Sequence, residues 1–420
     1  MGAGHTHGPA APSPRRTVLA TLGVIVPLAV ATLVALIWMW PASPEPAPQP
    51  SGGLQRLTGT IAHITLKPCP TPPPEDGVAA GEQPPPDPET CGDAKVQLTS
   101  GPHTGRHVVT GLPSGPGAQK FADGDDVLLI YAEEETLDAP PYRISDHDRT
   151  SPLWLAGAAF ALAVIAFGRW RGLTALVGLA ITFVLLLMFV IPAILAGQPP
   201  LLVAIVGAAG IMLSVLYLTH GFTVTTSVAI IGTLTSLALT GLLSYLAIDL
   251  VQLNGITDES SFYLDTSYRI NTQGLLLASI LIGTLGVLDD VTVTQSVTVA
   301  ELAHANPGYT FRQLYRAAAR VGRAHIASVI NTIILAYAGA SLPLLLLISV
   351  GDQGLGEILG TPVLAQEIVR SVVGTLGLIA AVPITTALAA LTSTRNTPPA
   401  PRRSRHRRPI DDHLERHPTP

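Results

Sequence analysis

The chain has 420 residues, of which 48% are hydrophobic and only 13% are charged. Soluble globular domains contain about 25% charged residues, so this composition indicates a membrane protein whose main partner is the lipid bilayer. The formal net charge of -5 is small, which argues against a nucleic-acid partner.

Residues 1–17 are small, polar and Pro-rich, which predicts a disordered N-terminus. Two adjacent arginines then precede an apolar run over residues 18–40. A cleaved secretory signal has a shorter apolar core, whereas an uncleaved transmembrane anchor needs about 20 residues. The length of the run and the interfacial positions of Trp38 and Trp40 favour the anchor. We interpret the arginine pair as its cytoplasmic flank; a twin-arginine export signal is the alternative.

A Pro-rich linker over residues 41–53 leads into residues 54–150, which contain no run long enough to cross a membrane. Short stretches with alternating apolar and polar residues occur instead, as in residues 57–64 and 126–131. Gly, Pro and Asp bound these stretches, a pattern typical of strands. We therefore predict a small β domain, with an OB-like barrel as the more specific hypothesis and a Pro-rich loop over residues 70–90.

The only two cysteines, Cys69 and Cys91, flank this Pro-rich insert. Outside the cytoplasm we expect them to form a disulfide, and a pair of free thiols is the alternative. His103 and His107 lie nearby, but their spacing does not fit the usual metal sites. We predict no metal and no cofactor.

From residue 152 onward the chain is nearly all apolar, which predicts a transmembrane domain over residues 152–391. Together with the anchor, its segments give about eight spans, and thus a mainly α polytopic helix bundle with the β domain between spans one and two. The seven segments after the anchor are residues 153–167, 172–194, 201–218, 223–248, 273–299, 326–349 and 366–391. The basic, Pro-rich residues 392–420 are predicted to be a disordered tail.

Arginines are concentrated in alternate loops. Residues 169–171, residues 312–323 and the C-terminal tail carry most of them, whereas the three intervening loops hold only Arg269. The positive-inside rule makes the Arg-rich face cytoplasmic. Both termini are therefore expected in the cytoplasm and the β domain on the opposite, extracytoplasmic side.

The loop before the seventh span is expected to contain a short helix that Thr310 caps. Its arginines recur at three- and four-residue steps, so they form one stripe that we expect at the lipid headgroups. The arginines are Arg312, Arg316, Arg320 and Arg323.

The sixth predicted span carries two adjacent carboxylates, Asp289 and Asp290. Ionisable residues inside spans are rare and expensive, and by default they suggest a functional site. On a helix, Asp290 shares one stripe with small, hydroxyl and acidic residues, which we expect to face a protein interior or a water-filled cavity. The other members of this stripe are Gly283, Gly286, Thr294, Val297 and Glu301.

Two carboxylates this close repel each other when both are ionised, so a retained proton or a bound cation is expected between them. Hydroxyl oxygens could complete the shell of a hard cation. The alternative is a structural role, in which polar residues such as Gln295 and His325 bind the helices together. The candidate binding residues for a solute or cation are Asp290, Asp289, Thr284, Thr292, Thr294 and Asn331.

Residues 283–294 can also be aligned with residues 374–385, in which two alanines replace the aspartates. This similarity predicts a parallel repeat of helix pairs, as in many transporters. The alternative is that Gly and Thr are simply common packing residues in spans.

Residues 283–291, with sequence GTLGVLDDV, and residues 330–343, with sequence INTIILAYAGASLP, resemble the YibE/F family of bacterial membrane proteins. The resemblance extends over about residues 54–391. The family pattern has one acidic residue before the Val, which matches Asp290 and makes Asp289 an addition. The resemblance implies a multi-pass protein of the bacterial plasma membrane with an N-terminal non-membrane domain, and it implies no known activity.

Our main hypothesis is membrane transport of a small solute or ion, with Asp290 central. The second is a non-transporting scaffold whose β domain binds a cell-envelope protein. The sequence shows no Ser/His or metal-ligand spacing that supports an enzyme, and it leaves the substrate and the oligomeric state open.

Overall fold

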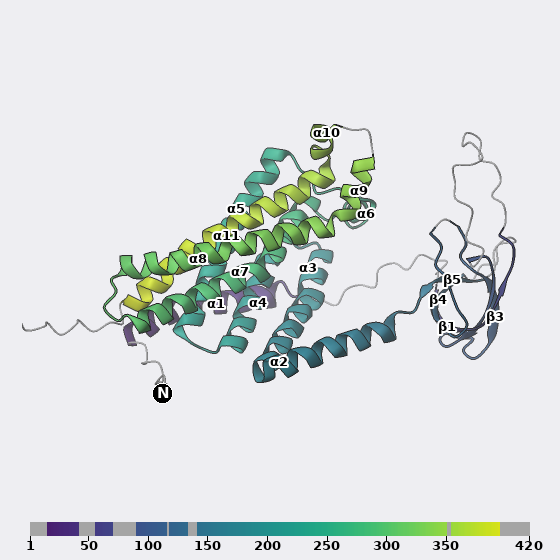
Figure 1. Cartoon of the computed structure of the whole chain (residues 1–420), viewed down its shortest axis with the longest axis horizontal. Coiled ribbons are helices and arrows are strands. Elements are labelled where there is room, and N and C mark those ends of the chain that lie inside the picture. The colour runs from purple at the N-terminus through teal and green to yellow at the C-terminus, as the bar shows by residue number, and fades with distance from the viewer. Residues whose placement is uncertain are drawn as a thin grey trace, which may run out of the picture. The chain divides into compact units, whose positions relative to one another are not determined.

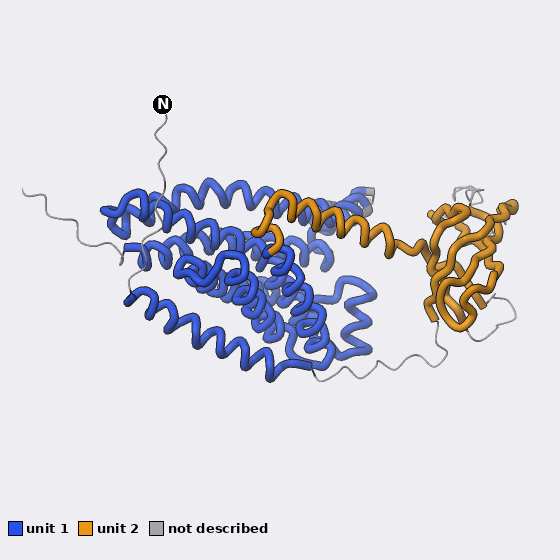
Figure 2. Tube along the Cα trace, turned by 90° about the horizontal axis from the view of Figure 1, so that it is seen from below, with its two compact units in different colours: residues 1–42, 174–420 blue, residues 43–173 orange. Residues whose placement is uncertain are grey.

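The computed structural model of the chain describes residues 15–41, 55–69, 90–115, 117–132, 141–350 and 354–394. The predicted disordered N-terminus and tail, the linker and the Pro-rich insert fall almost wholly outside these residues. The chain forms two compact units (Figure 2). One contains residues 43–173, and the other contains residues 1–42 and 174–420.

The unit of residues 43–173, unit 2 in Figure 2, contains a curled antiparallel half-barrel whose described strands have the order β3-β2-β1-β4-β5. β1 is long enough to pair with β4 through its first half and with β2 through its second half. The edge strands also meet, because the Thr110 hydroxyl of β3 donates to the Tyr142 carbonyl of β5 at 2.7 Å. The strands are Gln55–Leu66 (β1), Gly92–Leu98 (β2), His107–Gly111 (β3), Asp126–Tyr131 (β4) and Tyr142–His147 (β5).

Alternation along the strands builds the core of the half-barrel. In β2, Ala94, Val96 and Leu98 are buried, whereas Lys95 and Gln97 between them are exposed. Successive side chains of a strand point to opposite faces, so one face of the sheet is apolar and the other is polar. The predicted β domain is therefore confirmed.

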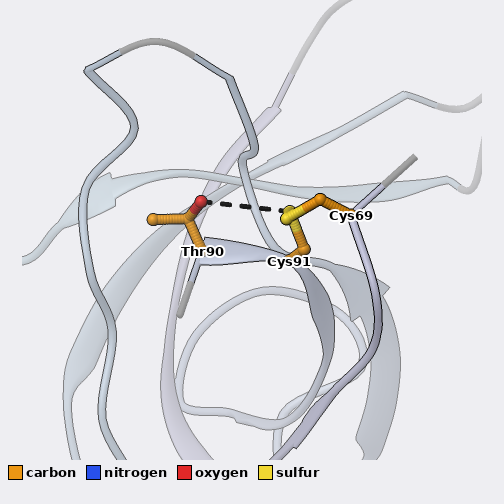
Figure 3. The surroundings of a disulfide bond; sticks show 3 residues. All are labelled: Cys69, Thr90 and Cys91. Atoms are coloured by element: carbon orange, nitrogen blue, oxygen red, sulfur yellow. Dashed lines mark hydrogen bonds between the residues drawn. A yellow bond between two sulfur atoms is a disulfide. The ribbon is translucent and has the colours of Figure 1, made fainter. Parts of the chain in front are cut away.

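Cys69, just after β1, is joined by a disulfide to Cys91, just before β2 (Figure 3). The two Cα atoms are 5.1 Å apart, and the Thr90 hydroxyl lies 4.0 Å from the Cys91 sulfur. The bond closes a chain segment that has the Pro-rich insert at its centre. Cross-links of this kind stabilise a small domain mainly by restricting the unfolded chain.

The connection from β5 to the first long helix of this unit is held by two exposed carboxylates. Arg149 donates to Asp146 at 2.8 Å, and this hydrogen bond holds the pKa of Asp146 well below its usual value. Asp148 accepts the Thr150 backbone N–H at 2.9 Å, at the point where α2 begins, and hydrogen bonding from Thr150 lowers its pKa as well.

We predict that this connection loosens only in acid. A depressed folded pKa gives stability that is present above the unfolded value of about 3.9 and is lost as the pH falls through the folded value. Hydrogen exchange of residues 148–153 should therefore keep its protection from pH 7 to pH 5 and lose it below about pH 4. An Asp148→Ala variant should lack the Thr150 protection at every pH. Loss of protection in the wild type above pH 5 would contradict this account.

The remaining elements are helical. Within the part of the chain that the structure describes, seven helical stretches are long and apolar enough to cross a membrane by length and composition. The helices are Arg15–Trp38 (α1), Thr150–Leu185 (α2), Ile191–Leu195 (α3), Pro200–His220 (α4), Val224–Val251 (α5), Glu259–Tyr268 (α6), Thr272–Ala305 (α7), Phe311–Ala340 (α8), Leu342–Val350 (α9), Leu355–Leu359 (α10) and Pro362–Thr394 (α11), with a π-helical turn, Leu186–Val190, between α2 and α3.

The predicted count of eight spans is not confirmed, because the second and third predicted spans lie in one helical stretch, Thr150–Leu195. That stretch is not straight, since Arg169 has non-helical angles (φ 52°, ψ -128°). A Cβ atom on Gly172 would overlap the Val164 carbonyl oxygen, although eight residues of straight helix separate two such positions by about 12 Å. The chain therefore folds back sharply at Arg169.

The seventh predicted span also differs from the structure. The expected short helix and this span form one continuous helix, α8, which ends at Ala340 and is followed by α9 with Pro343 near its start. As predicted, Thr310 caps α8, because its side chain accepts the Gln313 backbone N–H. The sequence analysis missed α6, whose first turn has a capping box of Asp258 and Ser261.

α7 lies at the centre of the helical unit, residues 1–42 and 174–420, and packs against α4, α5, α8 and α11 (Figure 1). Apolar side chains from these helices form one buried cluster, which includes Leu216 of α4, Leu288 of α7 and Leu378 of α11. This position makes α7 the element on which the arrangement of the other helices depends.

Candidate functional site

The helix that carries the two aspartates is long and well capped. Asn271 accepts the Gly274 backbone N–H at 2.7 Å and so caps the first turn of α7, and the helix ends at Ala305, just before Asn306 and Pro307. α7 has 34 residues. Asp289 and Asp290 are at its midpoint, about 25 Å from either end at 1.5 Å per residue. In a helix that crosses a bilayer, this is the level of the hydrocarbon centre.

Asp289 is largely buried. Its Oδ1 atom is inaccessible and has no hydrogen-bond partner among the described residues. It lies on the side of α7 that bears Leu285 and Thr292, which are both buried. Such a carboxyl group has lost its hydration without gaining a partner in exchange, which is costly and is uncommon outside functional sites.

Asp290 points the other way. It is exposed, together with Gly283, Gly286, Thr294 and Glu301. Of the two expected surroundings of this acidic stripe, the structure does not show the interior of the chain, because the four neighbouring helices cover the other sides of α7. A water-filled cavity stays a prediction. No atom lies within 4 Å of the position of a Cβ on Gly286, so the stripe is open around the middle of the helix.

The stripe continues into a groove of about 610 Å³ at the Ala305 end of α7. Thr294, Val297 and Glu301 line it from α7, and His220 lines it from the end of α4. His220 is the last residue of α4, which ends there because Gly221 takes a left-handed φ of 75°. The groove therefore extends from His220, at the end of α4, to the helical turn of α7 that follows Asp290.

A second hollow, of about 460 Å³, lies at the opposite end of α7. It is formed by the ends of α5 and α7 and by one residue of α6. Its polar lining consists of Asp249, Gln252, Asn254, Asp265, Asn271, Thr272 and Gln273. The two carboxylates make this opening acidic, so it favours cations over anions.

Between this hollow and the middle of α7, buried hydroxyl groups follow one side of α5. Each donates to the carbonyl four residues earlier, at 2.8 to 2.9 Å. The last of them, Thr233, lies 2.5 Å from the Thr292 hydroxyl of α7, and Thr292 donates to the Asp289 carbonyl at 3.1 Å. The hydroxyl groups belong to Ser244, Thr240, Ser236 and Thr233, all completely buried.

Two of the predicted binding residues have clear packing partners instead. Thr284 donates to the Ile280 carbonyl at 2.9 Å, and its methyl group fills the space beside Gly374 of α11. Thr292 contacts α5 as described above. The predicted shell of hydroxyl groups around both carboxylates is therefore not formed within the chain. Thr294 is exposed on the side of Asp290.

Asn331 is also separated from the carboxylates. α8 contacts the core through Ile330 and Ile333, and Asn331 is exposed on the far side of the helix. Gln295 binds neighbouring helices together, as the structural alternative predicted. Its side-chain amide donates to the Ala318 carbonyl of α8 at 3.1 Å and to the Thr386 hydroxyl of α11 at 2.7 Å.

Sequence reasoning missed a charged cluster near the start of α11. Arg370 donates to Glu367 at 2.8 Å and reaches the Ser279 hydroxyl of α7 at 3.4 Å. Both residues lie within residues 366–391, which were predicted as a span, and neither was identified there as a site residue. The three-residue spacing of opposite charges was the signal that could have identified this pair.

The described residues contain no group of three or more His, Cys, Asp and Glu side chains that could hold a metal ion. In comparisons with known proteins, a family model described as YibE/F-like protein matches residues 156–395. No curated protein and no solved structure matches the chain.

Proposed function

We propose that this chain, which belongs to the YibE/F-like family, is a multi-pass membrane protein that moves a proton or a small cation across the bilayer by way of Asp289 and Asp290. The observation that carries the proposal is the carboxyl pair at the midpoint of a long apolar helix, in which the Oδ1 atom of Asp289 is buried without a hydrogen-bond partner among the described residues and Asp290 is exposed. Intramembrane carboxyl groups are characteristic of proton relays and ion pathways.

The two hollows supply access from both ends of α7. The acidic hollow at the Thr272 end attracts cations, and the buried hydroxyl groups of α5 extend from it toward Thr292 and Asp289. On the other side, the groove at the Ala305 end leads along Glu301 and Thr294 to Asp290. Asp290 thus lies on the side of the groove, whereas completely buried hydroxyl groups separate Asp289 from the acidic hollow. Alternating exposure of the two carboxyl groups is therefore part of the proposal.

The proposed topology has eight crossings, with the sharp reversal at Arg169 separating two of them. Residues 150–168 are apolar and unburied on every side, and a helix of this length spans about 28 Å, close to the hydrocarbon thickness. Arg169 and Arg171 at the reversal fit a cytoplasmic loop. This count places both termini in the cytoplasm of a bacterial cell and the half-barrel, which we interpret as OB-like from its strand order, on the extracytoplasmic side.

The test is proton flux into proteoliposomes that contain a pH-sensitive dye and are polarised with potassium and valinomycin. Wild-type protein should acidify the lumen, and Asp290→Asn should reduce the rate at least tenfold. Glu259→Gln, an exposed acidic residue of α6, is the matched control and should leave the rate unchanged. The same series with sodium- and potassium-sensitive dyes distinguishes a proton from another cation.

Equal flux in wild type and Asp290→Asn would remove this residue from the mechanism. The absence of flux for any cation would instead favour the scaffold hypothesis, in which the half-barrel binds a cell-envelope protein. Its disulfide-closed fold is the observation that suits such a role. In that case, deletion of residues 54–150 should abolish the effect that the intact protein has in the cell, whereas Asp290→Asn should preserve that effect.

A further inference from the structure

The outward face of α8 carries an amide group that nothing in the described chain satisfies. Asn331 is exposed, and its side chain takes part in none of the hydrogen bonds among the described residues. The neighbouring Thr332 differs, because its hydroxyl donates to the Ser328 carbonyl of its own helix at 3.1 Å. Asn331 is therefore a polar group on this face whose side-chain hydrogen bonds are not satisfied within the described residues.

Two contacts with α7 fix the depth of Asn331. The Gln295 amide donates to the Ala318 carbonyl, and the Tyr337 hydroxyl lies 3.7 Å from the position of a Cβ on Gly283. Asn331 lies between Ala318 and Tyr337 on α8, so it is level with the part of α7 between Gln295 and Gly283. That part includes the midpoint of α7, which places Asn331 deep in the hydrocarbon layer when α7 spans the membrane.

Lipid chains cannot accept or donate hydrogen bonds, so an isolated carboxamide at this depth costs free energy. Four of the five residues around Asn331 on the same face are small and the fifth is a leucine, and all are exposed. They are Ala324, Ala327, Ser328, Leu335 and Ala338. Small residues let a second helix backbone approach closely enough for an interhelical hydrogen bond to form.

We propose that this face of α8 binds the same face of a second copy of the chain, with the two Asn331 side chains hydrogen-bonded to each other near a two-fold axis. A carboxamide has both a donor and an acceptor, so it is self-complementary. Two-fold symmetric interfaces require this property, because each residue near the axis meets its own copy. The exposed arginines Arg323 and Arg320 lie about two and three turns away along α8, where headgroups and water can screen their repulsion.

Cysteine cross-linking tests the geometry directly, since both native cysteines are in the Cys69–Cys91 disulfide. In lipid nanodiscs or native membranes, oxidation of the full-length Asn331→Cys variant should give a covalent dimer. The matched control is Leu242→Cys, an equally lipid-exposed position on α5, which should remain monomeric. Equal cross-linking at both positions, or none at position 331, would overturn the proposal.

A second measurement does not depend on the introduced thiol. Single-molecule photobleaching of labelled protein in dilute liposomes gives the dimer dissociation constant. Asn331→Leu should raise this constant about tenfold, as expected for the loss of interhelical hydrogen bonds of about 1–2 kcal/mol, and Asn331→Gln should restore much of the affinity. Thr332→Val should leave it unchanged, because that hydroxyl is satisfied within its helix. An unchanged constant for Asn331→Leu, or a different protein bound at this face in native membranes, would refute a self-associating face.

Discussion

A Gly377→Ala variant is expected to lose about 2 kcal/mol of stability, although it adds a single methyl group to a transmembrane helix. A Cβ atom at this position of α11 would overlap the Thr240 hydroxyl of α5 and would lie 3.1 Å from the Thr240 Cβ atom. The Thr240 side chain, including its hydroxyl group and its Cβ atom, is fully buried. The side chain of Thr240 therefore cannot rotate away without entering another contact.

The reason for this large effect is the way in which α5, α7 and α11 pack. Hydroxyl side chains of one helix occupy the space beside glycines of the next, as Thr240 does beside Gly377 and Thr284 beside Gly374. Lipid solvates apolar side chains as well as a protein core does, so close backbone approach and van der Waals contact supply most of the association energy between spans. A methyl group that separates two backbones removes this contact over several turns.

Two further variants make this prediction specific. Thr240→Ala in the Gly377→Ala background removes the overlapping hydroxyl and should restore much of the lost stability. Gly286→Ala is the matched control, because no atom lies within 4 Å of that Cβ position, and it should change stability by less than about 0.5 kcal/mol. The measurement is the unfolding midpoint of purified protein in detergent. Equal midpoints for Gly377→Ala and Gly286→Ala would mean that α5 and α11 are not packed as described.

The locations of the helices and strands were predictable, because they follow from local pattern. Alternation in β1 and β4 indicated strands, and long apolar runs indicated helices. The reversal at Arg169 was placed correctly as an interruption, but its sharpness depends on a positive φ at a residue other than glycine. No composition rule predicts that angle.

The orientation of α7 could not be predicted from the same pattern. In water, the polar side of a helix faces outward because burial of apolar surface drives folding. In lipid this driving force is absent between helices, so both the Thr284 side and the Asp290 side were acceptable packing faces. The structure buries Thr284 and exposes Asp290, and this orientation places the Thr284 methyl group beside Gly374 of α11.

Asp289→Asn is expected to raise stability and to lower proton flux in the same preparation. The Oδ1 atom of Asp289 is buried without a hydrogen-bond partner among the described residues, and the carboxyl group is next to a second carboxyl group at Asp290. A carboxamide of nearly the same size removes both the charge and the repulsion, so a gain of about 1–2 kcal/mol is expected. A group that destabilises the fold in this way is kept only where its chemistry is needed.

Asp290→Asn provides the comparison that separates burial from charge. Because Asp290 is exposed, its replacement in detergent should change the unfolding midpoint little, whereas it should lower the flux as strongly as Asp289→Asn does. The informative result is therefore a pair of variants with equal losses of flux and unequal changes of stability. Destabilisation by Asp289→Asn would show that the carboxyl group of Asp289 binds a partner that holds the helices together, and the structural interpretation of the acidic pair would then replace the relay.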